Sequence, residues 1–178
     1  MASGCRVCAS WPEELGRARS AVWFDEVARP AVHQLKYGGW WRVAEPMARQ
    51  MARLDPCMET GVLVPVPLAA ARARLRGYNQ AERLGRALAS LTGLPLRTDL
   101  LLRSRETRTQ TALAPEARRA NVAGAFRAAA VQAGIRLILV DDVFTTGATL
   151  LEAATALREA GAGRVESVTF ARAVPPVW

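Results

Sequence analysis

The sequence is poor in histidine and cysteine. The 178-residue chain contains one histidine, His33, and three cysteines, Cys5, Cys8 and Cys57. A single histidine excludes H-E-x-x-H metalloproteases, multi-histidine metal sites and paired-histidine proton relays. A serine or cysteine hydrolase would have to use His33, and no G-x-S-x-G nucleophile elbow accompanies it. Three cysteines are too few, and odd in number, for a disulfide framework.

Long apolar runs are also lacking. The longest stretch without Asp, Glu, Lys or Arg is Thr60–Ala71, which is too short to span a bilayer. No charged and then apolar signal segment opens the chain. We therefore expect a soluble, cytoplasmic protein without membrane insertion. The length fits one domain with at most a small appendage, and an apolar fraction of 51% argues against intrinsic disorder.

Lysine is nearly absent, because the positive charge is carried almost wholly by arginine. Of the 24 basic residues only Lys36 is a lysine, and the formal net charge is +8. Between Arg72 and Arg119 eleven arginines stand against four acidic residues, so this part of the chain carries +7. Such a basic stretch serves phosphate ligands, nucleic acid or an acidic partner, and the alternative is an ordinary solvated face.

The first 20 residues predict a loose N-terminal arm with few apolar residues at regular spacing. Cys5-x-x-Cys8 has the spacing of half a zinc site, but a closed structural site needs four ligands. Cys57 and His33 would complete such a site only by a coincidence of the fold. We therefore do not expect bound zinc, and two free thiols are the favoured interpretation.

The rest of the chain divides into a helical part, 21–58, and an α/β part, 59–178. Helical spacing of apolar residues covers Ala28–Tyr37 and Trp41–Leu54. In 59–178, apolar runs predict strands at Val62–Val66, Leu96–Leu102, Leu137–Val140 and Arg164–Ala171, with a short one near Ala125–Arg127. Apolar residues at helical spacing follow the strands predicted at Val62–Val66 and at Leu137–Val140. This alternation predicts an open, mostly parallel, twisted sheet with helices on both faces, which binds ligands at the carboxyl ends of its strands.

The segment Leu137–Leu150 carries the most informative chemistry. Asp141 and Asp142 follow a buried strand, and the small, hydroxyl-bearing turn Thr145-Thr146-Gly147-Ala148-Thr149 then opens a helix. Convergent backbone N–H groups and the positive end of the helix dipole make such a turn a cradle for a phosphate monoester. Carboxylates repel phosphate and suit sugar hydroxyls or a metal-bound diol. Together the two features describe the binding of a ribose 5-phosphate.

This segment resembles the fingerprint of type I phosphoribosyltransferases, in which apolar residues, two acids and T-T-G-x-T follow in this order. The resemblance implies the type I phosphoribosyltransferase fold with a small N-terminal hood, here residues 21–58, and binding of 5-phosphoribosyl diphosphate (PRPP) with Mg²⁺. It implies that Asp141 and Asp142 contact the ribose hydroxyls. The residues that would hold the 5-phosphate are Thr145, Thr146, Gly147, Ala148 and Thr149.

The resemblance also assigns roles to two basic segments. The loop after the first strand, Pro67–Gly77, would hold diphosphate through Leu68, Arg72, Arg74 and Arg76, because the arginine fork meets phosphate oxygens in pairs. The long polar segment Arg103–Asn121 would be a mobile flap that closes over the site. Its candidate residues are Arg103, Arg108, Gln110, Arg118, Arg119 and Asn121.

Further motifs narrow the resemblance to the ComF family and extend it over about residues 30–172. They are Leu35-Lys36-Tyr37-Gly38, Val64-Pro65-Val66-Pro67, Arg76-Gly77-Tyr78-Asn79-Gln80-Ala81-Glu82, Gln110, Leu113, Arg118-Arg119-x-Asn121 and Gly124-Ala125-Phe126. That family is linked to competence for DNA uptake. Its N-terminus usually carries a four-cysteine zinc module, of which only the pair Cys5 and Cys8 is present here.

Two functions follow from this resemblance as expectations. The first is Mg²⁺-dependent transfer of ribose 5-phosphate from PRPP to an acceptor that the sequence does not name. The second is a non-catalytic competence protein of the same fold that docks a helicase or binds single-stranded DNA. Only Tyr78 lies among the arginines of 72–119, which weakens the case for base stacking. A homodimer is a further expectation.

Three aromatic or polar residues near these segments have open roles. Trp40 and Trp41 fit either base stacking or a position in a core or interface. Tyr78 lies next to the predicted diphosphate loop, where it fits packing or contact with a ligand. Asn79, with Glu82 three residues later, has the pattern of a helix N-cap.

Overall fold

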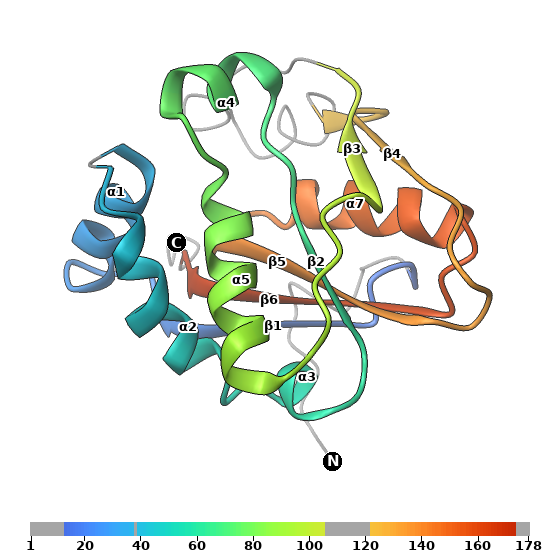
Figure 1. Cartoon of the computed structure of the whole chain (residues 1–178), viewed down its shortest axis with the longest axis horizontal. Coiled ribbons are helices and arrows are strands. Elements are labelled where there is room, and N and C mark those ends of the chain that lie inside the picture. The colour runs from blue at the N-terminus through green and yellow to red at the C-terminus, as the bar shows by residue number, and fades with distance from the viewer. Residues whose placement is uncertain (1–12, 38, 106–121, 174–178) are drawn as a thin grey trace, which may run out of the picture.

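The computed structural model describes residues 13–37, 39–105 and 122–173 of the chain (Figure 1). Among these residues the elements follow in the order β1 (Arg17–Trp23), α1 (Ala28–Tyr37), η1 (Trp41–Val43), α2 (Ala44–Met51), α3 (Asp55–Met58), β2 (Val62–Pro65), α4 (Ala70–Arg76), α5 (Gln80–Thr92), β3 (Leu101–Arg103), β4 (Phe126–Ala128), β5 (Arg136–Phe144), α7 (Ala148–Glu159) and β6 (Arg164–Arg172). No helix in the described part of the chain is long and apolar enough to cross a membrane.

The central sheet has four parallel strands in the order β1-β6-β5-β2. Its middle strand β5 pairs with β2 through Val64 opposite Leu139, and with β6 through Asp141 opposite Thr169. A small antiparallel pair, β3–β4, stands apart from the sheet. The α/β class with a mostly parallel sheet, predicted from the sequence, is thereby confirmed.

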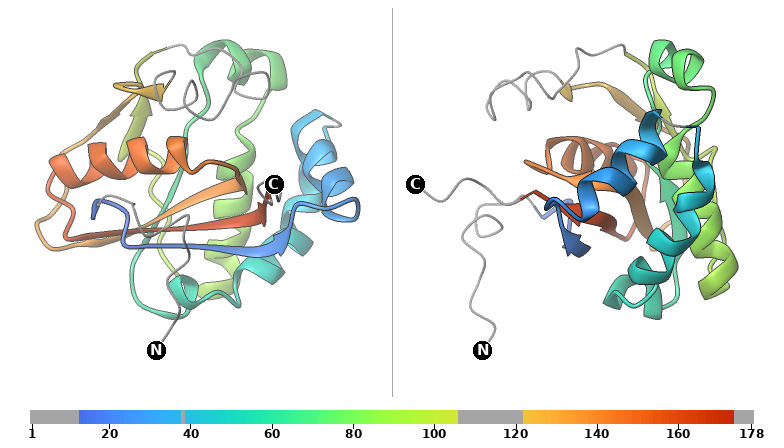
Figure 2. Two further views of the ribbon diagram at one scale, coloured as in Figure 1. Left: turned by 180° about the vertical axis from the view of Figure 1, so that it is seen from behind. Right: turned by 90° about the vertical axis from the view of Figure 1, so that its left-hand side faces the viewer.

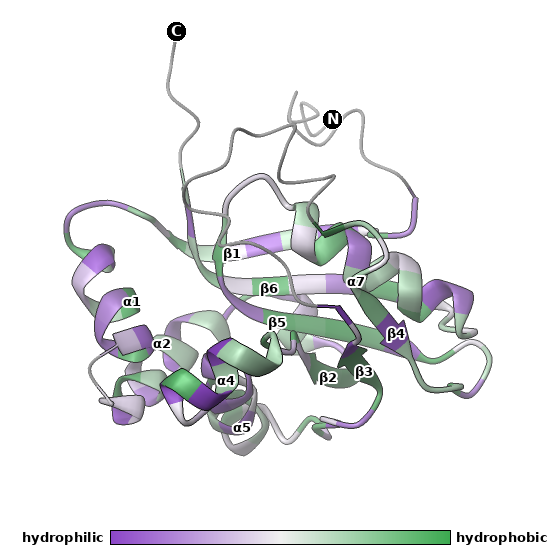
Figure 3. Cartoon of the chain, turned by 90° about the horizontal axis from the view of Figure 1, so that it is seen from above, coloured by the Kyte–Doolittle hydropathy of each residue, from purple (hydrophilic) through white to green (hydrophobic). Residues whose placement is uncertain are grey.

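Helices cover both faces of the sheet, because β5 is apolar on both sides along most of its length (Figure 3). Leu137 and Leu139 point into a core shared with α7 and the β3–β4 pair. Ile138 and Val140 point into a second core shared with α1, α2 and α5. Figure 2 shows α7 on the face opposite to α5 and α2. Each of these side chains is fully buried, which stabilises the fold by about 1.5–3 kcal/mol per residue.

The N-terminal part differs from the prediction. Residues 1–20 were expected to form a loose arm, but β1 is a strand that pairs in parallel with β6, so the expected boundary between arm and hood falls inside it. β1 is one of the two edge strands of the sheet and is only half-buried, and its first residues alternate arginine with small residues. It therefore lacks the apolar run from which a strand is predicted. Residues 1–12 lie outside the described residues.

Two further local predictions were wrong. The Arg-rich segment after β2 was expected to be a loop, but its alanines, which favour helix, form α4. Gly77 ends this helix with a φ of 77°, a left-handed conformation that glycine adopts without strain. The strand expected at Leu96–Leu102 is reduced to a single bridge between Leu63 and Leu96, followed by the short strand β3.

Candidate functional site

A cavity of about 660 Å³ opens at the carboxyl edge of the sheet. Its floor is the end of β5 and the turn into α7, one wall is α4 with the segment before it, and the other wall is the end of α1. Parallel strands present their carboxyl ends on one edge, and the connecting segments after β2 and β5 therefore meet there. The fold thus brings together three segments, of which the first and the last are more than a hundred residues apart.

The two adjacent carboxylates lie in this cavity. The sequence predicts a strand that ends at Val140, but β5 continues to Phe144 and carries both acids near its carboxyl end. Asp142 is only 3% exposed, and its Oδ1 accepts a hydrogen bond of 2.9 Å from the backbone N–H of Val143. The Oδ1 of Asp141 accepts a bond of 2.8 Å from the backbone N–H of Asp142. Burial, and then the neighbouring charge of Asp142, raise the pKa of Asp141 to about 8.

A cation reaches the acid pair from α1. The Nζ atom of Lys36 lies 2.6 Å from Oδ2 of Asp142, and its side chain is only one-quarter exposed, at 25%. Burial by itself lowers the pKa of Lys36, but the attraction of Asp142 outweighs this and leaves the pKa above its ordinary value. Lys36 belongs to one of the motifs shared with the ComF family, but the sequence alone assigns it no role. The signal that could have found it is that it is the only lysine in the chain.

The hydroxyl-bearing turn lines the cavity beside the acids. Thr145, Gly147, Ala148 and Thr149 all contribute to the lining. Thr146 does not, and its Oγ1 instead accepts a bond of 3.4 Å from the backbone N–H of Ala148. Gly147 precedes the 12-residue helix α7 and has a φ of 75°, so its backbone turns the chain into the helix. Four of the five residues predicted to hold the phosphate therefore face one space.

The wall formed by α4 contains most of the predicted diphosphate residues. Leu68, Arg72 and Arg76 line the cavity, whereas Arg74 is exposed and does not. Arg74 points away because α4 is a helix. Arg72 and Arg76 are four positions apart and share one face of it, whereas Arg74 lies on another face. The guanidinium of Arg76 donates a bond of 2.6 Å to Gln80 and lies 5.1 Å from the centre of the Tyr37 ring.

The corner between α4 and α5 ties the site to α1. Tyr78 lines the cavity, and its hydroxyl donates a bond of 2.6 Å to the carbonyl of Leu35. Asn79 caps α5 by accepting a bond from the backbone N–H of Ala81 at 3.1 Å, and it donates to the carbonyl of Val66 at 3.0 Å. Asn79 therefore has the structural role that the sequence suggested, and Tyr78 combines a structural contact with a place in the cavity wall.

The remaining candidates are less informative. Of the predicted flap, Arg103 lines the cavity, and Arg108, Gln110, Arg118, Arg119 and Asn121 lie outside the described residues. The same holds for Cys5 and Cys8. Cys57 is buried, and its burial raises the pKa of the thiol to about 11.

Comparisons with known proteins agree with this geometry. A model of the phosphoribosyl transferase domain matches residues 42–174. The DNA utilization protein YhgH of Salmonella typhimurium is 32% identical over 169 residues, which cover 91% of this chain and 74% of that protein. Competence protein F of Haemophilus influenzae is 38% identical over 114 residues, which cover 62% of this chain and 50% of that protein. The chain belongs to the ComF family. A further relative, competence protein ComFC of Bacillus subtilis, is 29% identical over 180 residues, which cover 94% of this chain and 72% of that protein.

Solved structures similar to this ComF-family chain include phosphoribosyltransferase-fold proteins. Glutamine PRPP amidotransferase from B. subtilis is 24% identical, and the match covers 78% of this chain and 26% of that one, with a TM-score of 0.47. Adenine phosphoribosyltransferase from Leishmania donovani is 20% identical, with coverages of 72% and 50% and a TM-score of 0.37. The type I phosphoribosyltransferase fold of the ComF family, predicted from the fingerprint at 137–150, is confirmed by the family match.

Proposed function

We propose that this chain binds PRPP and transfers its ribose 5-phosphate to an acceptor, as part of the handling of DNA taken up by the cell. The observation that carries the proposal is the single cavity that joins the acid pair, the turn at 145–149 and the arginine face of α4. PRPP carries a 5-phosphate, vicinal hydroxyls and a diphosphate around one ribose. The turn at 145–149, the acid pair and the arginine face of α4 match these three parts in chemistry. The association with DNA uptake is supported by relatives named for competence and DNA utilization.

Each wall has a defined task in this proposal. The backbone N–H groups at the start of α7 and the hydroxyls of Thr145 and Thr149 hold the 5-phosphate. Asp141 and Asp142 accept hydrogen bonds from the ribose hydroxyls. Arg72 and Arg76 bind the diphosphate, whose departure leaves a ribosyl cation, so that fixed charges and positioning are what the protein must supply.

The donor set also fits a magnesium ion that arrives with its ligand. Among the described residues no group of three His, Cys, Asp or Glu side chains could hold a metal by itself. Mg²⁺ accepts such a site, because it keeps several waters and binds one or two carboxylates plus substrate phosphates. Asp141 and Asp142 are the side chains that would lie beside it. When bound, the ion neutralises charge on the departing diphosphate.

Calorimetric titration with PRPP and Mg²⁺ tests binding. We expect the wild type to bind and Asp141→Asn to lose at least about tenfold in affinity, since a charged hydrogen bond is worth about 1.5–3 kcal/mol. Asp99→Asn is the matched control, because Asp99 is exposed and lies outside the cavity lining. Absence of heat with the wild type overturns the proposal.

Release of diphosphate separates a transferase from a binding protein. Enzyme, PRPP and Mg²⁺ are incubated with purine bases, pyrimidine bases and short single-stranded DNA, and diphosphate is measured with a coupled assay. We expect release above the rate of spontaneous PRPP hydrolysis with one acceptor class, and loss of this release in Asp141→Asn. Binding without release from any acceptor favours the non-catalytic alternative.

A second candidate function, binding of single-stranded DNA by a non-catalytic competence protein, is favoured by a cluster of arginines on aromatic rings. Arg83 lies 4.8 Å from the ring centre of Trp41, Arg42 lies 5.6 Å from the same ring, and Arg76 lies over Tyr37. The sequence alone placed only Tyr78 among the arginines, whereas the fold adds hood aromatics, and Trp41 is 44% exposed. Exposed rings beside arginines are what stacking of bases requires.

Affinity for oligothymidine at several salt concentrations tests this candidate. We expect the affinity to fall with salt, because arginines that neutralise phosphates release counterions. Trp41→Ala would weaken binding at every salt concentration and leave the salt slope unchanged, whereas Arg83→Ala would reduce the slope. No binding at low salt removes this candidate and leaves docking of a helicase as the remaining non-catalytic role.

A further inference from the structure

Lys36 is the one basic residue of this chain that is not an arginine, and it is the one that meets the acid pair. The other 23 of the 24 basic residues are arginines. An ammonium is a compact point charge on a thin stem, whereas a guanidinium is a wide planar fork. Lys36 reaches from the last turn of α1 to the end of β5, where its ammonium lies 2.6 Å from a carboxylate of a residue that is 3% exposed. The compact cation of the chain is therefore the one that pairs with Asp142.

The backbone that carries Lys36 is held in place on both sides. Leu35 is fully buried, and its carbonyl accepts the bond of 2.6 Å from the Tyr78 hydroxyl. The ring of Tyr37 lies under the guanidinium of Arg76 at 5.1 Å. The last turn of α1 is therefore fastened to the corner between α4 and α5, and the ammonium of Lys36 is delivered from a fixed point.

The acid that Lys36 meets is held by two contacts of different kinds. One oxygen of Asp142 accepts from the backbone N–H of Val143, and the other faces the ammonium. These two contacts, one to each carboxylate oxygen, fix the orientation of the Asp142 side chain. Asp141, by contrast, has a backbone bond to one oxygen and lines the cavity beside it.

We infer that Lys36 is a positioning residue of the ligand site: through its ion pair it orients the Asp142 carboxylate that receives the vicinal hydroxyls of a ribose 5-phosphate ligand. This inference rests on the proposed function, since it assigns a role within the same site. It makes the hood part of the sugar-binding machinery in addition to any part it has in choosing an acceptor. It also means that the acid pair cannot be understood from residues 137–150 alone.

The test compares two sugars and needs no catalysis. Affinities for ribose 5-phosphate and for 2-deoxyribose 5-phosphate are measured by calorimetry in the presence of a chelator, with wild type, Lys36→Met, Lys36→Arg and the control Arg49→Met. Arg49 is an exposed cation of α2 outside the cavity. We expect Lys36→Met to weaken ribose 5-phosphate binding by about tenfold or more, as loss of a charged contact predicts. In Lys36→Met, the preference for ribose 5-phosphate over 2-deoxyribose 5-phosphate is expected to be lost. Lys36→Arg is expected to retain part of this preference.

The outcomes separate the inference from the proposed function. If the wild type binds neither sugar phosphate nor PRPP, the proposed function and the inference both fail. If the wild type binds and Lys36→Met binds within twofold of it, or loses both sugars equally, only the inference fails. If Lys36→Met does not fold, the double variant Lys36→Met/Asp142→Asn removes both charges together. The inference then requires that this variant bind 2-deoxyribose 5-phosphate and show no preference for ribose, and a retained preference overturns it.

Discussion

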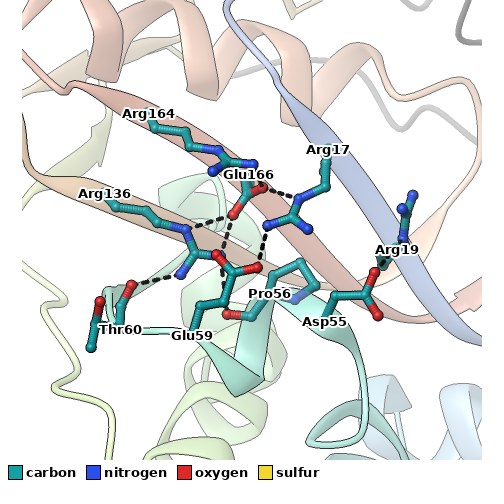
Figure 4. A network of polar contacts seen from close by, with 9 residues as sticks. All are labelled: Arg17, Arg19, Asp55, Pro56, Glu59, Thr60, Arg136, Arg164 and Glu166. Atoms are coloured by element: carbon teal, nitrogen blue, oxygen red, sulfur yellow. Dashed lines mark hydrogen bonds and ion pairs between the residues drawn. The ribbon is translucent and has the colours of Figure 1, made fainter.

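The two ends of strands β5 and β6 carry charged clusters that are balanced in opposite ways. At the amino end, Glu166 is fully buried and meets the guanidinium groups of Arg17, Arg136 and Arg164 (Figure 4). At the carboxyl end, two adjacent carboxylates meet the single ammonium of Lys36. In direct ion pairs, three cations therefore meet one acid at the amino end, whereas one cation meets one of two acids at the carboxyl end.

The surplus at the amino end is absorbed by further protein groups. Arg136 also donates to the carbonyl of Thr60 at 2.6 Å, and Arg17 pairs with Glu59 at 2.7 Å. Burial acts to raise the pKa of Glu166, but the hydrogen bonds from Arg17 and then Arg136 outweigh it and hold the pKa below its ordinary value. A cluster completed in this way joins β1, β5 and β6 through groups of the protein itself.

The deficit at the carboxyl end has the opposite sign. The pKa of Asp141 is raised because burial and the charge of Asp142 are not fully offset by the protein. A site that leaves its own carboxylates short of donors and cations is suited to a ligand that brings them. Perturbed acids in a cavity are a marker of function for this reason, whereas the Glu166 cluster is a marker of architecture.

The largest effect is expected from neutralising the amino-end cluster. Glu166→Gln leaves three arginines around a buried group without charge, and removal of one partner of a buried ion pair costs about 3–5 kcal/mol. Urea unfolding at neutral pH measures this loss. The exposed Glu45→Gln is the control and should change little. A loss below about 1 kcal/mol for Glu166→Gln would show that the cluster is not structural.

The same acid-to-amide change at the other end should act in the opposite direction. We expect Asp141→Asn to raise the free energy of unfolding at neutral pH by about 1 kcal/mol, while it weakens the binding of PRPP. The reason is that burial raises the pKa of Asp141, so that folding at neutral pH costs free energy for this carboxyl that it does not cost for a neutral amide. Binding sites are commonly less stable than the fold allows. Urea unfolding beside the calorimetric titration tests the pair of effects. A destabilisation of Asp141→Asn as large as that expected for Glu166→Gln would show that both acids stabilise the fold, and would contradict the proposed difference between the two ends.

The pH dependence of stability should also separate the ends. Asp141 has a raised pKa, so that the folded state retains a proton that the unfolded state has lost, and stability falls as pH rises from about 4 to about 8. Glu166 has a lowered pKa, so that its contribution is present above its unfolded pKa of about 4.3 and is lost as pH falls further. Urea midpoints between pH 3 and 9 should show both slopes, with only the first abolished in Asp141→Asn. An unchanged slope in that variant contradicts the assignment.

The smallest effect on ligand binding is expected at the helix cap next to the cavity. Asn79→Ala removes the N-cap of α5 and should cost about 1 kcal/mol of stability. Because Asn79 does not line the cavity, ribose 5-phosphate affinity should change less than in Asp141→Asn. A larger loss of affinity than in Asp141→Asn would place the cap within the ligand-binding machinery.

Features that depend on a short continuous segment were predictable from the sequence. β5 could be recognised because Leu137–Val140 is apolar on both faces, and the turn at 145–149 because its residues are neighbours in the chain. α5 was expected to begin at its cap Asn79, and this is confirmed. The helix α4 was missed, because its arginines suggested a ligand loop and outweighed the helix preference of its alanines.

Features that depend on distant residues were not predictable in the same way. β1 becomes a strand because β6 offers it a hydrogen-bonding edge, and its own residues give little sign of this. Arg17 and Glu166 are 149 positions apart and meet only because these two strands pair. Trp41 and Arg83 come together because α2 and α5 pack on one face of the sheet.

The sequence determined the chemistry of short segments, whereas the tertiary structure determined which distant charges pair. The amino-acid pattern at 137–150 was enough to identify the fold family and to predict a kind of ligand, since the hydroxyl-bearing turn and the acids lie within one segment. The tertiary structure decided which charges are neutralised: Glu166 by three arginines, and Asp142 by the lone lysine of the hood. Electrostatic energy depends on distance in space and on burial, and neither quantity is written in the order of residues along the chain.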